Sequence, residues 1–331
     1  MCTILITGAS GFIGSFLVEE ALDRGFTVWA AVRKSSPKQY LQDSRINFIE
    51  LDLNDWHKLR QQLEGHRFDY VIHSAGVTKC NQPEDFFRVN TTGTVNLVEA
   101  LKAAGMPLRR FVFISSLSVS GPVREERPYT DIKCTDEPRP DTLYGQSKAM
   151  AENFLEEQKD LPWITLRLTG VYGPREKDYF LMFKSIKQHV DFAVGYKPQA
   201  LTFVYVKDVV QAAFLALDHG TLHKPYIISD GETYSSRTFS DLVKQELNVR
   251  LLLRIKAPLW LLKAITSVGQ FVGHTTGHMP VLNKDKYHIL SQRNWRCDIT
   301  PALTELNYAP LYNLEKGVAE TARWYREQGW I

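Results

Sequence analysis

The sequence predicts an α/β protein built on a doubly wound parallel sheet, with a smaller, mainly helical C-terminal lobe. Short apolar runs alternate with longer segments of helical periodicity over the first half of the chain, as crossover connections between parallel strands require. The runs are apolar at nearly every position, which is typical of strands covered by helices on both faces. A change of pattern after about Gly170, where helical segments dominate, marks the second lobe.

Each element follows from a local pattern of apolar residues and turn residues. Strands are expected at Thr3–Thr7, Thr27–Val32, Asn47–Leu51, Tyr70–Ser74, Arg110–Ser115 and Ile164–Leu168. Helices are expected between them at Phe12–Arg24, Asp55–Leu63, Pro83–Ala104 and Asp141–Asp160.

The domain organisation follows from the same patterns. Residues 1–170, with strand-like returns at Leu201–Val206 and Tyr226–Ser229, are assigned to the first domain, and residues 171–331 mainly to the second lobe. Residues 124–140 hold three prolines and no periodicity, so we expect a loop beside the sheet edge, and loops of that length are usually functional or mobile.

Composition excludes several classes of protein. The chain has 331 residues, 44% hydrophobic and 23% charged, as in soluble globular proteins, and a net charge of +3 without a basic block argues against nucleic acid. Its four cysteines (Cys2, Cys80, Cys134 and Cys297) form no Cys-x-x-Cys, which fits a reducing compartment and offers no zinc site. With no signal-peptide pattern at the N-terminus, a cytoplasmic location is expected.

The most apolar late segment runs from Leu251 to Val272. It carries Arg254, Lys256, Pro258 and Lys263, which argue against a membrane span. We interpret it as a packed helix pair in the second lobe; the alternative is a surface that touches a membrane.

A glycine-rich turn, Thr7-Gly-Ala-Ser-Gly-Phe-Ile-Gly14, joins the first strand to the first helix. Gly8 permits a tight turn, Gly11 lets backbone N–H groups approach a pyrophosphate, and Gly14 allows close packing of helix on strand. Because the helix N-terminus offers unpaired N–H donors to anionic oxygens, the turn predicts dinucleotide binding, with Ser10, Phe12 and Ile13 among the contacts. A plain strand-to-helix turn is the alternative.

The end of the second strand indicates which cofactor is bound. An acidic residue there would bind the ribose 2′-hydroxyl, but this chain has Arg33 and Lys34, which can clamp a 2′-phosphate. We therefore predict NADP(H), with NAD(H) possible; an ordinary solvated basic turn is the alternative.

Other strand ends are expected to line the same cofactor. Asp52 and Leu53 follow the third strand and are placed to meet the adenine, although Asp52 or Asn54 could instead cap the helix at Asp55–Leu63. The small residues Ser74, Ala75 and Gly76 end the fourth strand and suit a closely passing ligand, whereas the preceding His73 reads mainly as a core histidine.

Two copies of Tyr-x-x-x-Lys occur, Tyr144 with Lys148 and Tyr129 with Lys133, and about one is expected by chance in a chain with 14 tyrosines. On a helix the two residues share a face, and an ammonium beside a phenol would lower the phenol pKa from about 10 toward neutrality. Only Tyr144 opens a run of good helix formers, and it lies 28 residues after Ser116, at a strand's carboxyl end. Tyr129 lies in a proline-rich stretch without helical period.

Together these motifs resemble the extended short-chain dehydrogenase/reductase family, the NAD(P)-dependent epimerase/dehydratase superfamily. The resemblance rests on the glycine turn, His73-Ser-Ala-Gly76, Asn90, Ser116, Tyr144 and Lys148, and on Leu166-Arg-Leu-Thr-Gly-Val-Tyr-Gly-Pro174 and Phe203-Val-Tyr-Val-Lys-Asp208. It covers residues 2 to about 230 and continues weakly to Trp324. It implies a Rossmann domain, a C-terminal substrate lobe, contacts from Val171 to the cofactor, and often a homodimer.

The resemblance also implies catalytic roles. Tyr144 would be the general acid/base for a substrate oxygen, Lys148 would depress its pKa and hold the nicotinamide ribose, and Ser116 would orient the carbonyl. Asn90 would help to relay protons through water. As alternatives, Ser116 is a loop hydroxyl and Asn90 a helix-kink residue.

Two departures from the family narrow the reaction. Dehydratases of this family place Asp-Glu after the catalytic hydroxyl, where this chain has Leu117 and Ser118, so elimination is disfavoured. Nucleotide-sugar enzymes often place Arg-Asp before the Phe203 strand, where this chain has Leu201 and Thr202; a diphosphate would need another cation from the set Arg175, Lys177 and Lys197. The chain thus resembles the dihydroflavonol-reductase and hydroxysteroid-dehydrogenase branch.

The sequence therefore predicts an oxidoreductase that transfers hydride between a nicotinamide and a carbonyl or secondary alcohol of a small molecule. A sugar-nucleotide epimerase is the alternative within the family, and a non-catalytic dinucleotide sensor is the alternative of another class, disfavoured by the intact Ser116, Tyr144 and Lys148. We expect no metal, because His274 and His278 lack a third ligand and Gly277 lies between them. Cys80 is expected in a loop, with a place in the pocket wall as the alternative.

Overall fold

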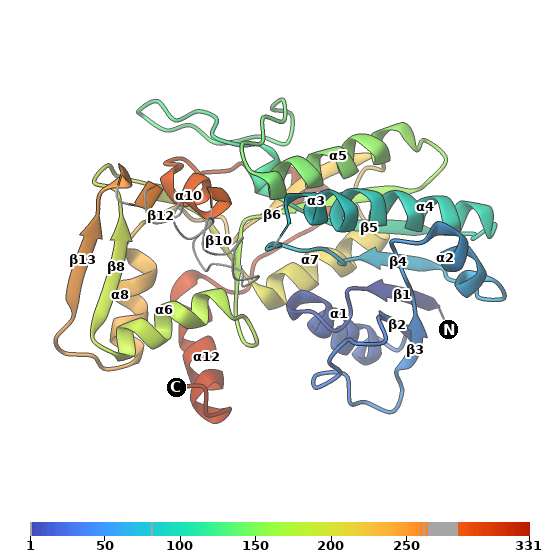
Figure 1. Ribbon diagram of the computed structural model, residues 1–331, viewed down its shortest axis with the longest axis horizontal. Helices are drawn as coiled ribbons and strands as arrows, with labels where there is room; N and C mark the ends of the chain where they lie inside the picture. Colours follow the sequence, from blue (N-terminus) through green and yellow to red (C-terminus); the bar gives the residue numbers. More distant parts are fainter. Residues whose placement is uncertain (1, 81, 261, 264–283) are drawn as a thin grey trace.

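The protein is built on a seven-stranded parallel sheet, seen near its edge in Figure 1. The computed structural model describes residues 2–80, 82–260, 262–263 and 284–331. The strand order is β11-β6-β5-β4-β1-β2-β3, and each neighbouring pair is parallel. The order reverses between β1 and β4, and this switch point is where ligands bind in open α/β sheets. The predicted doubly wound fold is confirmed.

The first six strands agree with the sequence prediction to within one residue at each end. They are β1 (Thr3–Thr7), β2 (Thr27–Val32), β3 (Asn47–Glu50), β4 (Tyr70–His73), β5 (Arg110–Ser116) and β6 (Trp163–Leu168), with β11 (Lys224–Ile228) as the returning edge strand. Strands such as β4 and β6 are buried at every position, which explains their continuous apolar character.

Helices cover both faces of the sheet (Figure 1). One face carries α1 (Phe12–Asp23) and α7 (Val206–Asp218), which pack on each other. The other carries α2 (Trp56–Leu63), α4 (Gly93–Ala103) and α5 (Leu143–Glu157). Each face has its own apolar core, so the sheet is dry on both sides.

Two local predictions in this half are corrected. The helix expected at Pro83–Ala104 is interrupted, because α3 (Pro83–Phe86) and α4 are joined by a π-helical turn at Phe87–Thr92. The N-cap of α2 is Asp55, whose carboxylate accepts a hydrogen bond from the Lys58 N–H at 3.1 Å, and neither Asp52 nor Asn54 fills that place.

The second lobe combines helices with small sheets. Its helices are α6 (Asp178–Lys187), α8 (Thr238–Glu246), α10 (Lys284–Ser291), α11 (Thr300–Glu305) and α12 (Leu314–Glu327). Its strands pair as β7 (Gly170–Tyr172) with β10 (Phe203–Tyr205), β9 (Ala200–Leu201) with β12 (Tyr234–Ser235), and β8 (Val190–Val194) with β13 (Leu253–Ala257). An aromatic-rich core joins α6, α8 and α12.

The strand-like returns and the apolar segment differ from expectation. Of the two returns, the one at Tyr226–Ser229 joins the seven-stranded sheet as β11, whereas Leu201–Val206 is divided between β9 and β10 in the small sheets. Within Leu251–Val272, residues 253–257 form strand β13 and no helix, because they pair with β8; most of the remainder lies outside the described residues. Among the described residues, no helix is long and apolar enough to cross a membrane.

The segment at residues 124–140 is irregular, as predicted, and it is attached to the C-terminal part of the chain. Ile132 forms an isolated bridge with Cys297, and Arg124 pairs with Asp136 within the segment at 2.6 Å.

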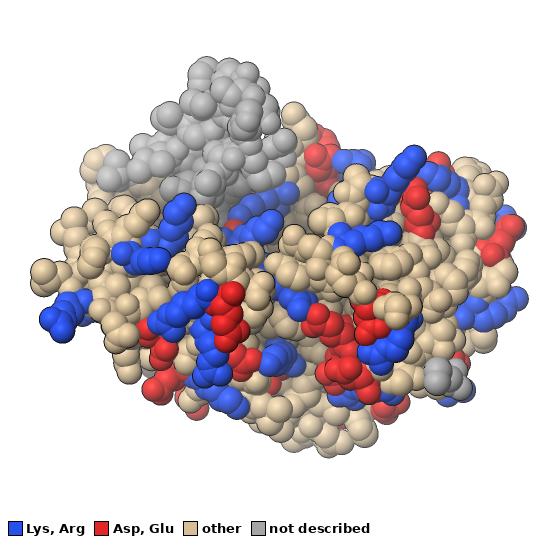
Figure 2. Space-filling model, turned by 90° about the horizontal axis from the view of Figure 1, so that it is seen from below, with Lys and Arg blue, Asp and Glu red and all other residues tan. Residues whose placement is uncertain are grey.

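On the face shown in Figure 2, Lys and Arg are interspersed with Asp and Glu.

Candidate functional site

The glycine turn between β1 and α1 has the geometry of a phosphate cradle. Gly8 has φ +66°, and a Cβ there would lie 2.7 Å from the Ala75 nitrogen. A Cβ on Gly14 would lie 2.0 Å from the Gly8 carbonyl oxygen, so only glycine lets the helix start this close to the strand. Gly11 is the N-cap residue of helix α1. No side chain caps the helix there, and its first turn holds no acidic residue. Its first N–H groups are thus arranged to receive an anion, which fits a dinucleotide pyrophosphate.

A shallow cavity of about 430 Å³ lies at the ends of β2 and β3, the strands that follow β1 in the order of the sheet. Arg33, Lys34 and Asp52, all singled out by sequence, line it. Lys58 from α2 lines it as well, a residue that sequence reasoning missed although it lies six positions after Asp52. The Asp52 carboxylate accepts a hydrogen bond from the Asn54 N–H at 3.1 Å, which shapes the turn.

The remaining predicted cofactor contacts flank the switch point. Ser74, Ala75 and Gly76 follow β4, and a Cβ on Gly76 would lie 3.2 Å from Lys148 Nζ. The Leu53 carbonyl oxygen accepts a hydrogen bond from Asn96 Nδ2 at 2.8 Å. Ser10, Phe12 and Ile13 belong to the turn and the first turn of α1, and half-buried Val171 lies in β7.

His73 is a core histidine, as expected. Its two ring nitrogens contact the hydroxyls of Thr7 at 2.6 Å and Thr94 at 3.0 Å. Burial, with a smaller contribution from Lys148, lowers the pKa of His73 to about 3, so the ring is neutral.

Ser116 and Tyr144 lie together at the carboxyl end of β5. Ser116 ends the strand, and its hydroxyl accepts a hydrogen bond from the Ser118 N–H at 3.2 Å. Burial raises the pKa of Tyr144, and a hydrogen bond with the Ser116 side chain lowers it in part. Gly145 allows this approach, because a Cβ there would lie 2.5 Å from the Ser118 carbonyl oxygen.

Lys148 lies one helical turn after Tyr144 and is 4% exposed. Its Nζ donates to the Ile114 carbonyl oxygen at 2.8 Å and lies 4.6 Å from the Phe113 ring centroid. Burial lowers the pKa of Lys148 from 10.5 to about 8, partly offset by Glu152. The expected depression of the Tyr144 pKa by Lys148 is not what this structure shows, because burial of the phenol outweighs the other influences on it.

A buried ion pair lies behind Lys148. Glu152, on α5, and Arg167, on β6, are 4% and 2% exposed and pair at 2.7 Å. Ser115 also donates to Glu152. Sequence reasoning missed this group, although Glu152 continues the four-residue spacing of Tyr144 and Lys148.

Asn90 lies in the π-helical turn, with its side chain fully buried. Its Oδ1 accepts from the Val77 N–H at 2.8 Å, and its Nδ2 donates to the Val77 carbonyl at 3.0 Å and to Ser147 Oγ at 2.9 Å. Ser147 in turn donates to the Tyr144 carbonyl oxygen at 2.8 Å. Asn90 thus ties the chain after Gly76 to the helix that carries Tyr144, and π-turns often occur at functional sites.

The second lobe completes the start of α5. Thr142 caps the helix by accepting from the Gly145 N–H at 2.9 Å, while the N–H groups of Leu143 and Tyr144 donate to the two carboxylate oxygens of Asp285, each at 3.1 Å. His288, also on α10, lies 3.1 Å from the Asp141 carboxylate. No local pattern in the sequence marks Asp285, because its partners lie more than 140 positions away.

The residues at the positions where the chain departs from the family pattern make contacts within the protein. Leu117 is 1% exposed, and Thr202 donates to the Trp295 carbonyl at 2.8 Å. Arg175, the first candidate substitute for a diphosphate cation, binds Ser15 at 2.9 Å and Glu19 at 2.6 Å and stacks on two aromatic rings. Lys177 and Lys197 are exposed.

Cys80 and the pair His274 and His278 were also singled out by sequence. Burial is the main cause that raises the pKa of Cys80 to about 11, so it stays a thiol at neutral pH. His274 and His278 lie outside the described residues, and no group of three or more metal-binding side chains occurs within the part that is described.

Comparison with known proteins places this site in a family. The model of the NAD dependent epimerase/dehydratase family matches residues 4–229, which include the glycine turn, Ser116, Tyr144 and Lys148. The chain belongs to the NAD-dependent epimerase/dehydratase family. It is therefore an enzyme of the extended short-chain dehydrogenase/reductase type, as the sequence predicted.

Relatives of two functional kinds match over nearly the whole chain. A 3 beta-hydroxysteroid dehydrogenase/Delta 5-->4-isomerase of Mycobacterium tuberculosis is 26% identical, covering 97% of this chain and 90% of its own. UDP-glucuronate 4-epimerase 5 of Arabidopsis thaliana is 28% identical, covering 98% and 75%. The crystal structure of UDP-glucose 4-epimerase from Thermotoga maritima superposes with a TM-score of 0.80 at 24% identity, covering 98% of this chain and 99% of that one, which bears on the fold alone.

Proposed function

We propose that the enzyme is an NADP(H)-dependent dehydrogenase or reductase that acts on a ketone or secondary alcohol of low charge. Tyr144 is the acid/base for the substrate oxygen, Ser116 holds that oxygen, and Lys148 holds the nicotinamide ribose. NADP(H), when bound, supplies or accepts the hydride. Asn90 and the Glu152–Arg167 pair keep α5 and Lys148 in place.

The observation that carries this proposal is that uncharged residues occupy the positions where dehydratases and nucleotide-sugar enzymes of the family need charged ones. Leu117 is buried in the core, so the position that holds an acid in dehydratases cannot serve elimination. Leu201 and Thr202 occupy the position of a diphosphate-binding pair, and Arg175 is held by Ser15 and Glu19 against α1. The similarity to a hydroxysteroid dehydrogenase over 97% of the chain agrees with this choice, as the similarity to an epimerase over 98% agrees with the alternative.

A panel of ketones and alcohols tests the reaction. The enzyme is incubated with NADPH or NADP⁺ and each candidate, and the change in nicotinamide absorbance is followed. Net stoichiometric consumption or production of NADPH is expected with an apolar ketone or alcohol. Isomerisation of a nucleotide sugar without net consumption would establish the epimerase alternative, and tight cofactor binding without turnover on any substrate would favour the sensor.

The cofactor preference rests on the cavity at the ends of β2 and β3. Arg33, Lys34 and Lys58 line it together, and a 2′-phosphate is recognised by such a basic cluster. Glu50 and Asp52 line the same cavity, so the charge there is mixed. NADPH is expected to bind about tenfold or more tightly than NADH.

Substitution of Arg33 tests whether its side chain contacts the 2′-phosphate or only adds to the overall positive charge of the protein. Arg33→Ala should weaken NADPH binding and leave NADH binding nearly unchanged. Arg67→Ala removes an exposed arginine elsewhere and serves as the control. Equal affinity of the unsubstituted enzyme for NADPH and NADH, or an Arg33→Ala variant unchanged toward NADPH, would contradict the preference.

We also infer a homodimer that works in a reducing compartment such as the cytoplasm. The family resemblance supports the dimer, and the four free cysteines support the compartment. Sedimentation equilibrium measures the first, and fractionation of cells measures the second.

A further inference from the structure

The β8–β13 ribbon lies at one end of the molecule, with α6 and α8 behind it (Figure 1). The two strands are parallel, with Leu253 opposite Val190, Arg254 opposite Asp191, and Ile255 opposite Phe192. Because side chains alternate along a strand, Asp191 and Arg254 share one face, while Phe192, Leu253 and Ile255 share the other.

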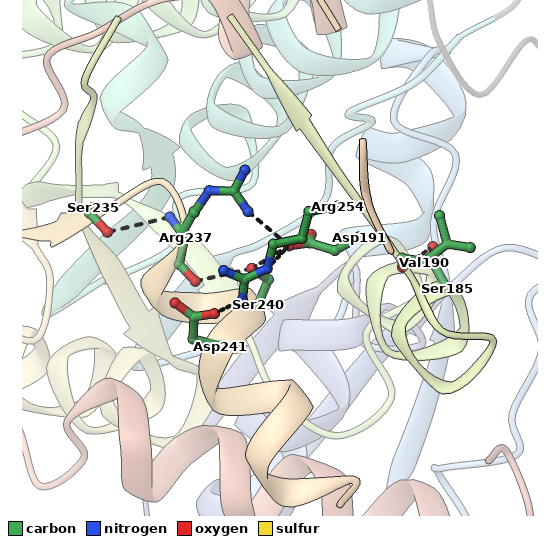
Figure 3. Close-up of polar contacts among 8 residues, drawn as sticks. All are labelled: Ser185, Val190, Asp191, Ser235, Arg237, Ser240, Asp241 and Arg254. Atoms are coloured by element: carbon green, nitrogen blue, oxygen red, sulfur yellow. Dashed lines mark hydrogen bonds and ion pairs between the residues drawn. The ribbon is translucent and has the colours of Figure 1, made fainter. Parts of the chain in front are cut away.

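The face that packs on α8 is polar. Asp191 is 4% exposed, accepts a hydrogen bond from Ser240 Oγ at 3.1 Å, and lies 3.4 Å from Arg237 and 3.6 Å from Arg254 (Figure 3). Arg254 also binds Asp241 on the same helix. The side of the ribbon toward the protein is therefore held by charges and hydrogen bonds.

The face toward solvent is apolar. Phe192 is 67% exposed, Leu253 63% and Ile255 40%. A two-stranded ribbon on a water-soluble protein ordinarily places its apolar face inward and its polar face outward. Here the order is reversed, and no part of the chain that the structure describes covers the outer face.

Three more exposed apolar side chains adjoin the ribbon along the chain: Leu251 before β13, Trp260 after it and Tyr196 after β8. Together with Phe192, Leu253 and Ile255 they form what we call the ribbon patch. Contiguous apolar patches of this kind mark protein or membrane interaction sites.

The charges around the ribbon patch select its partner. Residues 250–263 contain four basic side chains, Arg250, Arg254, Lys256 and Lys263, and no acidic one. Arg254 is already paired with Asp191 and Asp241 on the inner face, so the outward-directed positive charge comes mainly from Arg250 and Lys256. Apolar and aromatic side chains interleaved with Lys and Arg are suited to the boundary of an anionic bilayer, where Trp and Tyr sit at the headgroups. A second copy of the chain would bring the same basic residues against themselves in a two-fold interface, which disfavours self-association through this face.

We propose that the ribbon patch docks the enzyme on the surface of an anionic lipid bilayer, without a membrane span. The contact goes beyond the proposed reaction and does not depend on it, since it is formed by residues of the β8–β13 end alone. Its consequence is that the second lobe is held at the bilayer surface.

Vesicle flotation tests the contact with the full chain. Binding to phosphatidylcholine vesicles that contain phosphatidylserine is expected, with much weaker binding to pure phosphatidylcholine and a decline as salt is raised. The variant with Phe192→Ser and Leu253→Ser should lower the partition coefficient about tenfold or more, because both side chains lose their place in the acyl boundary. Leu311→Ser is the matched control, since Leu311 is 62% exposed elsewhere on the surface and its loss should leave binding unchanged.

The charge requirement is tested separately. The variant with Arg250→Gln and Lys256→Gln should lower binding to the phosphatidylserine vesicles about tenfold, whereas Arg67→Gln with Lys159→Gln should not. Circular dichroism and NADPH binding show that each variant is folded. Equal binding to both vesicle types, no binding to either, or equal losses in the control variants would overturn the proposal. Ribbon variants that dissociate a dimer while vesicle binding persists would also overturn it.

Discussion

The two Tyr-x-x-x-Lys segments have the same spacing in sequence and opposite surroundings in space. Tyr144 and Lys148 lie on helix α5, and Lys148 is 4% exposed. Tyr129 and Lys133 lie in the irregular segment, where the Tyr129 hydroxyl donates to the Pro198 carbonyl at 2.9 Å and Lys133 is exposed.

The difference teaches that burial and support, more than spacing, give a lysine a shifted pKa. Burial lowers the pKa of Lys148 to about 8, and the Glu152–Arg167 pair lies directly behind it. Lys133 is exposed and lies outside any helix, so no helix holds it beside Tyr129. Tyr144, Lys148 and Glu152 can each be compared by substitution with a counterpart in the other segment.

The largest effect is expected from loss of the Tyr144 hydroxyl. Tyr144→Phe should lower kcat about 10²- to 10⁴-fold, because proton transfer to the substrate oxygen is lost while the ring is kept. NADPH affinity, measured by fluorescence titration, should change little. Tyr129→Phe should leave kcat unaltered. An active Tyr144→Phe variant, or an equal loss in Tyr129→Phe, would show that the wrong segment was chosen.

The next largest effect concerns stability. Glu152→Ala leaves Arg167 charged and buried without its partner, and should lower the free energy of unfolding by about 3–5 kcal/mol. Urea denaturation measures it. Asp136→Ala removes the partner of the exposed Arg124 and should cost only about 0–1 kcal/mol. Similar losses in the two variants would mean that the buried pair has no special weight.

Cofactor affinity should depend on pH through Lys148. The pKa of Lys148 is lowered to about 8, so its ammonium is present below that pH and is lost as the pH rises through it. If the ammonium holds the cofactor, the dissociation constant of NADPH should rise above about pH 8 and level off once the amine is neutral. Lys148→Met should bind more weakly and show no such rise, whereas Lys133→Met should keep it. A rise that persists in Lys148→Met would assign the titration to another group.

The smallest effect is expected at the start of α5. Asp285→Ala removes the acceptor of the Leu143 and Tyr144 N–H groups and should cost about 1 kcal/mol of stability, as other helix caps do. A fall in kcat about tenfold, with the KM for the cofactor unchanged, would follow if the cap also orients Tyr144. Asp285→Asn keeps an acceptor oxygen and should recover part of the loss. His288→Ala is the control, because it removes another contact between α10 and the start of α5, the one to Asp141. If His288→Ala lowered kcat as much as Asp285→Ala, the effect would come from the docking of α10 in general and not from the Asp285 carboxylate.

The sequence was sufficient where the structure depends on local patterns. The strands were found because each is apolar and bounded by turn residues, and the glycine turn was found because three glycines follow a strand and open a helix. Ser116 and Tyr144 were found from their order along the chain, and the structure brings them into contact at the end of β5.

The parts that could not be predicted depend on contacts between distant segments. Asp285 reaches Tyr144 across 141 positions, and the π-helical turn at Asn90 has no periodic signal. Residues 253–257 looked helical because their apolar composition does not show that they pair with β8. Glu152 is the exception, because its spacing after Lys148 could have identified it.

The contact between Asp285 and α5 limits how freely this enzyme can be recombined. The matched family region ends at residue 229, yet the first turn of the tyrosine helix receives its carboxylate from residue 285. A chimera that joined residues 1–229 to the C-terminal part of a relative would leave two amides at the reaction centre without an acceptor, unless the donor chain supplied an acid at the same point. The second lobe and the position of Tyr144, the proposed proton donor, are therefore inherited together in this protein.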